Sequence, residues 1–165
     1  MQVSENAVVD RLLSAARQTI VEVCYCWLTT ATSDGGAHAR AERAFAGGPD
    51  ADEWSRRFLC RRDSRKVSEI QRAPRVTLAY QDSAGDRYVA LIGRASIIDD
   101  HTEMRSLWQS DWDAYFPPGF ADANMVVARV DVDRIEIHAR GVTAEPFGHG
   151  RAWIERTITG WRLVP

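Results

Sequence analysis

The apolar positions at the start of the chain repeat with the period of a helix and then change to the period of a strand. Between residues 5 and 20, apolar side chains recur three or four positions apart, at Val8, Val9, Leu12, Leu13, Ala16 and Ile20. This spacing predicts an amphipathic helix, with Ser4 or Asn6 as its cap. From Val21 onward the chain is rich in β-branched and aromatic residues. Apolar residues on both alternating faces from Val23 to Leu28 predict a strand that is buried on both sides.

The rest of the pattern is mainly that of strands. Strands are predicted at residues 37–46, 54–60, 75–81, 87–98, 125–132 and 134–139, with a closing hairpin at 152–164. A short helix is predicted at 64–73, where Pro74 stops it, and another begins at Asp100 with Met104, Leu107 and Trp108 on one face. Residues 116–124 read as an irregular segment.

Many strands with few helices and no repeated strand–helix–strand rhythm favour a mainly β, antiparallel barrel. No stretch is rich enough in Pro, Gly or Ser to divide the chain. We therefore expect one domain over residues 1–165, with an N-terminal helix at 1–20 and a C-terminal extension at 144–165.

Composition excludes several classes of function. The 165-residue chain has a net charge of −2 and 45% hydrophobic residues, which argues against a nucleic-acid-binding or anionic-membrane surface. No apolar run approaches the roughly 18 residues that would span a bilayer, and the first residues do not form a signal peptide. Three cysteines without a C-x-x-C pair favour the reducing cytoplasm, with Cys24 and Cys26 packed in the core.

One corner of the chain is strongly basic although the whole is slightly acidic. Arg61, Arg62, Arg65 and Lys66 lie between a predicted strand and a predicted helix. Cations in the first turn of a helix are unfavourable, by about 0.3–1 kcal/mol each, unless an anion binds there. The segment therefore indicates either a phosphate-sized site or a solvated helix end, with Asp63 as cap and the arginines paired to nearby acids.

Several short motifs occur in a fixed order along the chain. A strand ending in F-x-C is followed by S-R-K at 64–66, a short helix, P-x-V-x-L-x-Y, and a strand with Y-V-x-L-x-G-x-A. Trp108, FPPGFAD at 116–122, a V-x-R-V strand and RIEIHA come next. Over residues 20–143 this ordered set resembles the pyridoxamine 5′-phosphate oxidase-like, FMN-binding split-barrel superfamily, and within it the general stress protein 26 group.

The resemblance implies a six-stranded antiparallel split barrel that forms a homodimer, with FMN in a groove at the interface touched by both chains. Ser64, Arg65 and Lys66 would hold the flavin phosphate. Arg40 and Tyr88 would orient the ring, and the backbone around Ala41 would face it. Cys60 stands where a hydroxyl residue often touches the phosphate, although its thiol is a weaker partner. The full implied set is Arg40, Ala41, Glu42, Arg43, Leu59, Cys60, Ser64, Arg65, Lys66, Tyr88, His138 and Arg151.

The C-terminal residues allow a further comparison with the true oxidases. GWRLVP at the end of the chain, with His149 and Arg151, matches the family's tail, and His149 is the one candidate catalytic residue. Phe147 replaces an arginine that grips the substrate phosphate, and Phe45 falls near the place of a substrate-contacting lysine. The positions that would contact the flavin are therefore better retained than those that would contact the substrate, and oxidation of pyridoxamine phosphate is not expected.

The resulting hypothesis is a cytoplasmic, homodimeric FMN flavoprotein that exchanges electrons with a small-molecule substrate and binds neither nucleic acid nor membrane. FAD or a deazaflavin are alternative cofactors. The rival reading is a non-catalytic or stress-related module that binds a flavin, a deazaflavin or haem. Haem would need an axial ligand, for which His38, His138 and His149 are the candidates.

Overall fold

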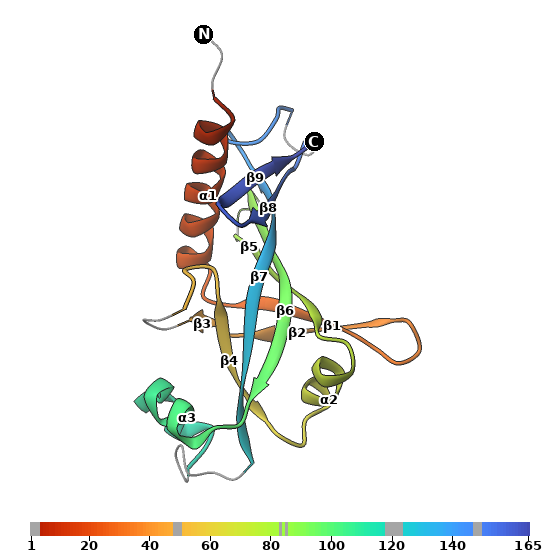
Figure 1. Cartoon of the computed structure of the whole chain (residues 1–165), viewed down its shortest axis with the longest axis vertical. Coiled ribbons are helices and arrows are strands. Elements are labelled where there is room, and N and C mark those ends of the chain that lie inside the picture. Colours follow the sequence, from red (N-terminus) through yellow and green to blue (C-terminus); the bar gives the residue numbers. More distant parts are fainter. Residues whose placement is uncertain (1–3, 48–50, 83, 85, 118–123, 147–149) are drawn as a thin grey trace.

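The computed structural model describes residues 4–47, 51–82, 84, 86–117, 124–146 and 150–165 (Figure 1). The helices are α1 (Glu5–Glu22), α2 (Arg65–Arg72), α3 (His101–Leu107) and the 3-10 helix η1 (Ser110–Ala114). The strands are β1 (Cys26–Ala31), β2 (Ala37–Glu42), β3 (Phe45–Ala46), β4 (Arg56–Arg61), β5 (Arg75–Gln81), β6 (Arg87–Ile98), β7 (Met125–Ala139), β8 (Ala152–Thr157) and β9 (Gly160–Val164).

All of these strands belong to one antiparallel sheet. Its order is β2-β1-β5-β6-β7-β4-β3, with β8 paired to β7 and β9 to β8. β2 and β3 lie at opposite ends of this order and do not pair, so the sheet curls without closing, which is the architecture of a split barrel. The predicted fold class and the predicted C-terminal hairpin are confirmed.

Helix α1 covers the main core and runs further than the sequence pattern predicted. Ser4 is its N-cap, and the Ser4 hydroxyl accepts a hydrogen bond from the Ala7 amide at 3.3 Å. The helix continues to Glu22, so the strand predicted to begin at Val21 begins instead at Cys26. Val21 is 79% exposed on the outer face of the helix, and its β-branched side chain gave a misleading strand signal there.

Strand β1 is buried on one face, and the prediction of burial on both faces was wrong. Cys26, Leu28 and Thr30 point into the protein, whereas Trp27 is 57% exposed. Cys24, which was expected in the core, is exposed because it precedes the strand. The outer face of β1 is left uncovered because, among the described residues, no helix or second sheet layer packs over it.

The longest strands, β6 and β7, form the axis of the molecule (Figure 1). The two strands predicted at 125–132 and 134–139 are one continuous strand, β7, with a bulge where Ile92 pairs with Arg134 and Gly93 pairs with Val132. A Cβ on Gly93 would lie 2.2 Å from the carbonyl oxygen of Asp131. Only glycine allows the two backbones to approach this closely.

Two apolar clusters lie at different levels of this axis. The large one fills the space between the sheet and α1, and includes Leu12, Phe58 and Ile135. A small one, beneath α3, consists of Ile98, Met104, Phe116, Met125 and Val127. Asp100 caps α3, as predicted, by accepting a hydrogen bond from the Glu103 amide at 2.9 Å. In the described part of the chain, no helix is both long and apolar enough to cross a membrane.

Candidate functional site

A cavity of about 540 Å³ lies where the N-terminus of α2 meets β2, β4 and η1. This volume is in the range of small-molecule and cofactor sites. Its walls are largely aromatic, and charged side chains are grouped near α2. The described lining residues are Tyr25, Ala41, Glu42, Arg43, Phe45, Leu59, Arg61, Ser64, Lys66, Asp111, Trp112, Tyr115 and Phe116. Six of the twelve residues expected to contact the cofactor are among them: Ala41, Glu42, Arg43, Leu59, Ser64 and Lys66.

Ser64 is the N-cap of α2 but does not act as a cap through its side chain. Its backbone is extended, and its side chain makes no capping hydrogen bond, unlike the side chains that cap α1 and α3. The Ser64 hydroxyl oxygen is buried and has no partner among the described residues. Amide groups in the first turn of a helix also lack partners inside the helix. The cavity wall therefore holds a buried hydroxyl and free donors that a bound anion would satisfy.

A second unpartnered donor lies in the aromatic wall. Trp112, on η1, is only 5% exposed, and its indole Nε1 has no partner in the described part of the chain. Its ring packs edge-on against Phe45 and Trp108, with centroids 5.1 and 5.6 Å away. The tryptophan is therefore fixed by packing, and its N–H is a buried donor without a partner among the described residues. Trp112 is one of the residues that line the cavity.

Lys66 brings a positive charge to the cavity, and Glu42 opposes it. The two side chains form an ion pair, and each is 15% exposed. Lys66 Nζ also lies 3.5 Å from the Leu59 carbonyl oxygen and 5.5 Å from the centre of the Phe58 ring. An anionic ligand would share Lys66 with this carboxylate. The site is thus less positive than its S-R-K motif alone suggests.

The other cations of the basic corner are paired with acids, as one of the two sequence interpretations expected. Arg61 lies 3.3 Å from Asp63, and Arg62 forms a bidentate pair with Asp99 that lowers the pKa of this carboxyl group. The solvated-end interpretation placed Asp63 as the cap of α2, but Ser64 occupies that position. Both interpretations therefore describe part of the corner: Arg61 and Arg62 are paired with acids, while Arg61, Ser64 and Lys66 line the cavity.

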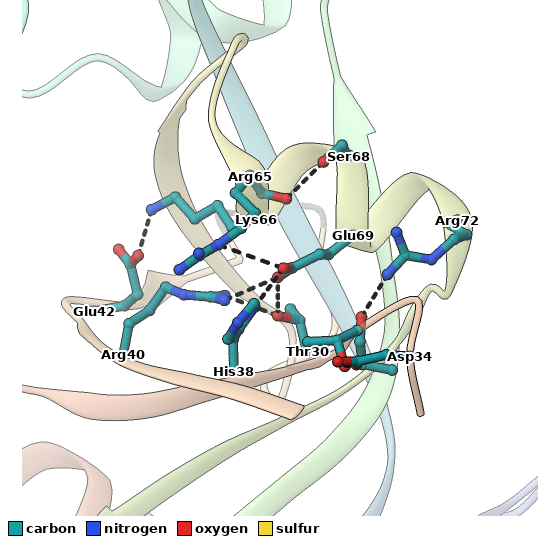
Figure 2. A network of polar contacts seen from close by, with 12 residues as sticks. Thr30, Asp34, His38, Arg40, Glu42, Arg65, Lys66, Ser68, Glu69 and Arg72 are labelled. Atoms are coloured by element: carbon teal, nitrogen blue, oxygen red, sulfur yellow. Dashed lines mark hydrogen bonds and ion pairs between the residues drawn. The ribbon is translucent and has the colours of Figure 1, made fainter. Parts of the chain in front are cut away.

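Arg40 and Arg65 belong to a cluster beneath α2 that also contains Thr30, His38 and Glu69 (Figure 2). We call this set the Glu69 cluster. The Glu69 side chain is 4% exposed. Burial alone would raise the pKa of this carboxyl group, but contacts with Thr30, His38 and Arg40 outweigh that effect and hold the pKa at about 2. Glu69 is therefore an ionised carboxylate buried in the protein.

Cys60 lies in the core, outside the described cavity lining. It is 1% exposed, and burial raises the pKa of its thiol to about 12. Strand alternation explains this placement, because Leu59 and Cys60 point to opposite faces of β4. No histidine is among the described residues that line the cavity. His149, the candidate catalytic residue, lies outside the described residues.

Three of the expected cofactor residues lie far from this cavity. Tyr88 of β6 pairs directly with His138 of β7. Arg151 forms a 2.9 Å ion pair with Glu136, which is also on β7. Leu59, in the cavity wall, pairs with Val127 of β7. Along β7, Val127 and His138 are separated by about 35 Å at the usual rise of a strand. One chain therefore cannot bring its cavity wall at Leu59 and its His138 to the same small ligand.

Sequence reasoning missed several residues of the site. Tyr25, Asp111, Tyr115 and Phe116 line the cavity, and Glu69 organises the cluster beneath it. The dense run of aromatic residues between 108 and 120 was a usable signal for the cavity wall. Another was the acid at position 69, placed between the buried positions Val67 and Ile70. A carboxylate among core-facing residues requires partners.

The fold and this site define the class of the protein: a split barrel with a ligand-sized cavity at a helix N-terminus. The chain belongs to the family of pyridoxamine 5′-phosphate oxidase-like proteins, because the model of that family matches residues 13–144. No curated protein sequence matches the chain.

Solved structures share the fold at low sequence identity. General stress protein 26 from Bacillus anthracis is 20% identical with a TM-score of 0.64, covering 77% of this chain and 93% of its own. An FMN-binding, pyridoxamine 5′-phosphate oxidase-related protein from Nostoc punctiforme is 16% identical with a TM-score of 0.64, over the full length of both chains. PhzG from Burkholderia lata, solved with tetrahydrophenazine-1-carboxylic acid, is 18% identical with a TM-score of 0.64, covering 96% of this chain and 90% of its own.

Proposed function

We propose that the protein is a flavoprotein that binds FMN in this cavity and exchanges electrons with a small-molecule substrate. The observation that carries the proposal is the buried, unpartnered hydroxyl of Ser64 at the start of α2, beside Lys66. A phosphate group accepts hydrogen bonds from this hydroxyl, from first-turn amides and from the Lys66 ammonium. The aromatic wall and the free Nε1 of Trp112 suit a flat ring that carries hydrogen-bond acceptors.

The chemistry divides between cofactor and protein in a simple way. FMN supplies hydride transfer when it is bound. The residues of this chain hold the phosphate, pack against the ring and exclude water from it. Phe45, Trp112 and Phe116 provide apolar surface for that purpose. Glu42 and Asp111 are the carboxylates of the described cavity lining, and this division of roles requires neither of them as a strong base.

We further propose that the functional unit is a homodimer. His138 on β7, Tyr88 opposite it on β6, and Arg151, which pairs with Glu136 of β7, are too distant to reach the cavity of their own chain, but a second copy can present them to it. Tyr25 and Trp27 are 59% and 57% exposed, and Tyr25 also lines the cavity. Large exposed aromatic side chains beside a ligand site are typical of an interface. The three free cysteines are compatible with a cytoplasmic location, which is part of this proposal.

The visible spectrum of the purified protein and the mass of its cofactor are the primary test. We expect flavin absorption, or quenching of FMN fluorescence on titration, with one FMN per chain. Replacing Arg65 and Lys66 together by Ala should weaken FMN binding at least about tenfold, since Lys66 lines the cavity and one charge-assisted contact contributes roughly 1.5–3 kcal/mol.

The matched control removes two cations elsewhere. Arg75 and Arg162 form exposed ion pairs and are not among the described residues that line the cavity, and replacing both by Ala should leave FMN affinity unchanged. A protein without flavin absorption and without measurable FMN affinity refutes the proposal. A loss smaller than threefold in the Arg65 and Lys66 variant places the phosphate elsewhere.

The second candidate function is a binder of a deazaflavin, with or without turnover. One structural neighbour is an F420 reductase, 20% identical with a TM-score of 0.56 over 72% of this chain and 94% of its own. Titration with a deazaflavin beside FMN separates the two cofactors by affinity. Anaerobic photoreduction followed by a panel of electron acceptors then separates an enzyme from a passive binder.

A further inference from the structure

Arg40 points beneath α2, onto the Glu69 cluster (Figure 2). Its guanidinium donates to the Thr30 hydroxyl and to Glu69 Oε2, at 2.9 Å each. The Arg40 side chain is 22% exposed, and Arg40 is not among the described residues that line the cavity. Both terminal nitrogens of the Arg40 guanidinium therefore donate to groups of the protein.

Glu69 is the centre on which this arrangement depends. Its Oε2 accepts from Thr30 at 2.6 Å and from Arg40, while its Oε1 lies 2.5 Å from His38 Nδ1 and 3.6 Å from Arg65 Nε. Both carboxylate oxygens are thus fully used. Burying a carboxylate has a desolvation penalty of several kcal/mol, and an apolar residue beside Val67 and Ile70 would avoid it. The carboxylate at position 69 is explained if it is needed to orient α2 and not only to stabilise the fold.

The cluster joins α2 and β2, which both line the cavity, to the neighbouring strand β1. Thr30 is on β1, His38 and Arg40 are on β2, and Glu69 is on α2. A helix of eight residues has little stability by itself, so its rotation is set by what it contacts. Apolar packing of Val67 and Ile70 tolerates small rotations and slides, whereas the three directed polar contacts of Glu69 with β1 and β2 do not.

We infer that Glu69 is a positioning residue that fixes the rotation of α2. Contacts with Thr30, His38 and Arg40 hold Glu69 in place, and α2 is thereby turned so that Ser64 and Lys66 face the cavity. Arg40 then acts on a phosphate-bearing ligand through Glu69, and not by touching it. This inference rests on the proposed function, since it concerns the same cavity. It assigns to Arg40 a role different from the direct contact that the family resemblance implied.

A double-mutant cycle tests the inference. The variants are Glu69→Gln, Arg40→Met and the two combined, with FMN and riboflavin titrated by flavin fluorescence. Riboflavin lacks the phosphate, so it reports the ring contacts alone. Each single substitution should weaken FMN binding by about tenfold, as expected when one charge-assisted hydrogen bond is lost. Riboflavin binding should change by less than about threefold. The combined variant should be no weaker than the weaker of the two singles.

Two outcomes of this cycle overturn the inference. If Arg40→Met costs another tenfold in the Glu69→Gln background, Arg40 contacts the ligand directly. If Glu69→Gln leaves the FMN dissociation constant unchanged, the cluster does not position α2. The matched control is Glu53→Gln, which removes an exposed carboxylate paired with Arg17 at 2.9 Å and should alter neither ligand's affinity.

Hydrogen exchange of the ligand-free, full-length protein gives a readout that is independent of FMN. In Glu69→Gln, the amides of residues 65–72 should exchange about tenfold faster than in the wild type, with β6 and β7 unchanged. If the wild-type protein binds no FMN, the proposed function fails, but this measurement still decides whether the cluster fixes α2. Unchanged exchange across α2 refutes the positioning role even if FMN binds.

Discussion

Acidification should remove the contribution of Glu69 to stability in a defined pH window. Its pKa in the folded protein is about 2, against an ordinary 4.5. Because the folded value is the lower one, the stabilisation is fully present above about pH 4.5 and is lost as the pH falls toward 2. At 1.36 kcal/mol per pKa unit, this carboxylate contributes on the order of 3 kcal/mol near neutral pH. The side chain is 4% exposed, so solvent screening reduces this figure little.

Urea denaturation of the wild type and Glu69→Gln between pH 6.5 and 2.5 measures this contribution. The difference between their free energies of unfolding should shrink by more than about 2 kcal/mol across the window. Glu53→Gln serves as the control, because its exposed ion pair with Arg17 should give a difference of less than about 1 kcal/mol. If the gap between wild type and Glu69→Gln is the same at both ends of the window, Glu69 titrates normally and the reasoning fails.

Three further predictions concern other parts of the structure. Ser64→Ala should weaken FMN binding roughly threefold to tenfold. The urea midpoint should stay unchanged, because the Ser64 hydroxyl makes no capping hydrogen bond to α2. A loss of stability without a loss of FMN affinity would show that the hydroxyl serves the helix alone. Glu42→Gln should tighten FMN binding by about tenfold relative to riboflavin, since the carboxylate competes with the phosphate for Lys66. Equal effects on the affinities of both ligands in fluorescence titration would contradict this competition. Gly93→Ala should lower stability by more than about 2 kcal/mol in thermal melts, because its Cβ would meet the Asp131 carbonyl oxygen. The control Ser96→Ala removes a buried hydroxyl without a described partner and should be neutral or stabilising. Similar losses of stability in both variants would exclude the close backbone approach as the cause.

Local signals predicted most of the secondary structure. The strands at 75–81 and 87–98 and the helix after Ser64 lie where periodicity and Pro74 indicated. Errors occurred where tertiary context decides. Val21 and Cys24 belong to a helix end and a connection, although their residue types favour a strand. The bulge in β7 joins two segments that a local break in alternation had separated.

The site was predictable only in the part that is contiguous in sequence. Ser64 and Lys66 line the cavity because the S-R-K motif sits at one helix terminus. The Glu69 cluster depends on the pairing of β1 with β2 and on the seating of α2, which no local pattern encodes. Arg40 looked like a ligand contact from its motif, but its direction is set by a carboxylate 29 positions away. The unpaired N–H of Trp112 is likewise a property of the packing, which no local pattern encodes.

The distance along β7 between Val127, which pairs with Leu59 of the cavity wall, and His138, which pairs with Tyr88 of β6, bears on how substitutions combine. In a two-fold dimer with shared sites, a chain altered at Lys66 and a chain altered at Tyr88 would assemble into a heterodimer with one doubly defective site and one intact site. Mixing two inactive homodimers would then restore up to half of the wild-type activity per heterodimer. Such intersubunit complementation cannot occur if each chain carries a complete site of its own.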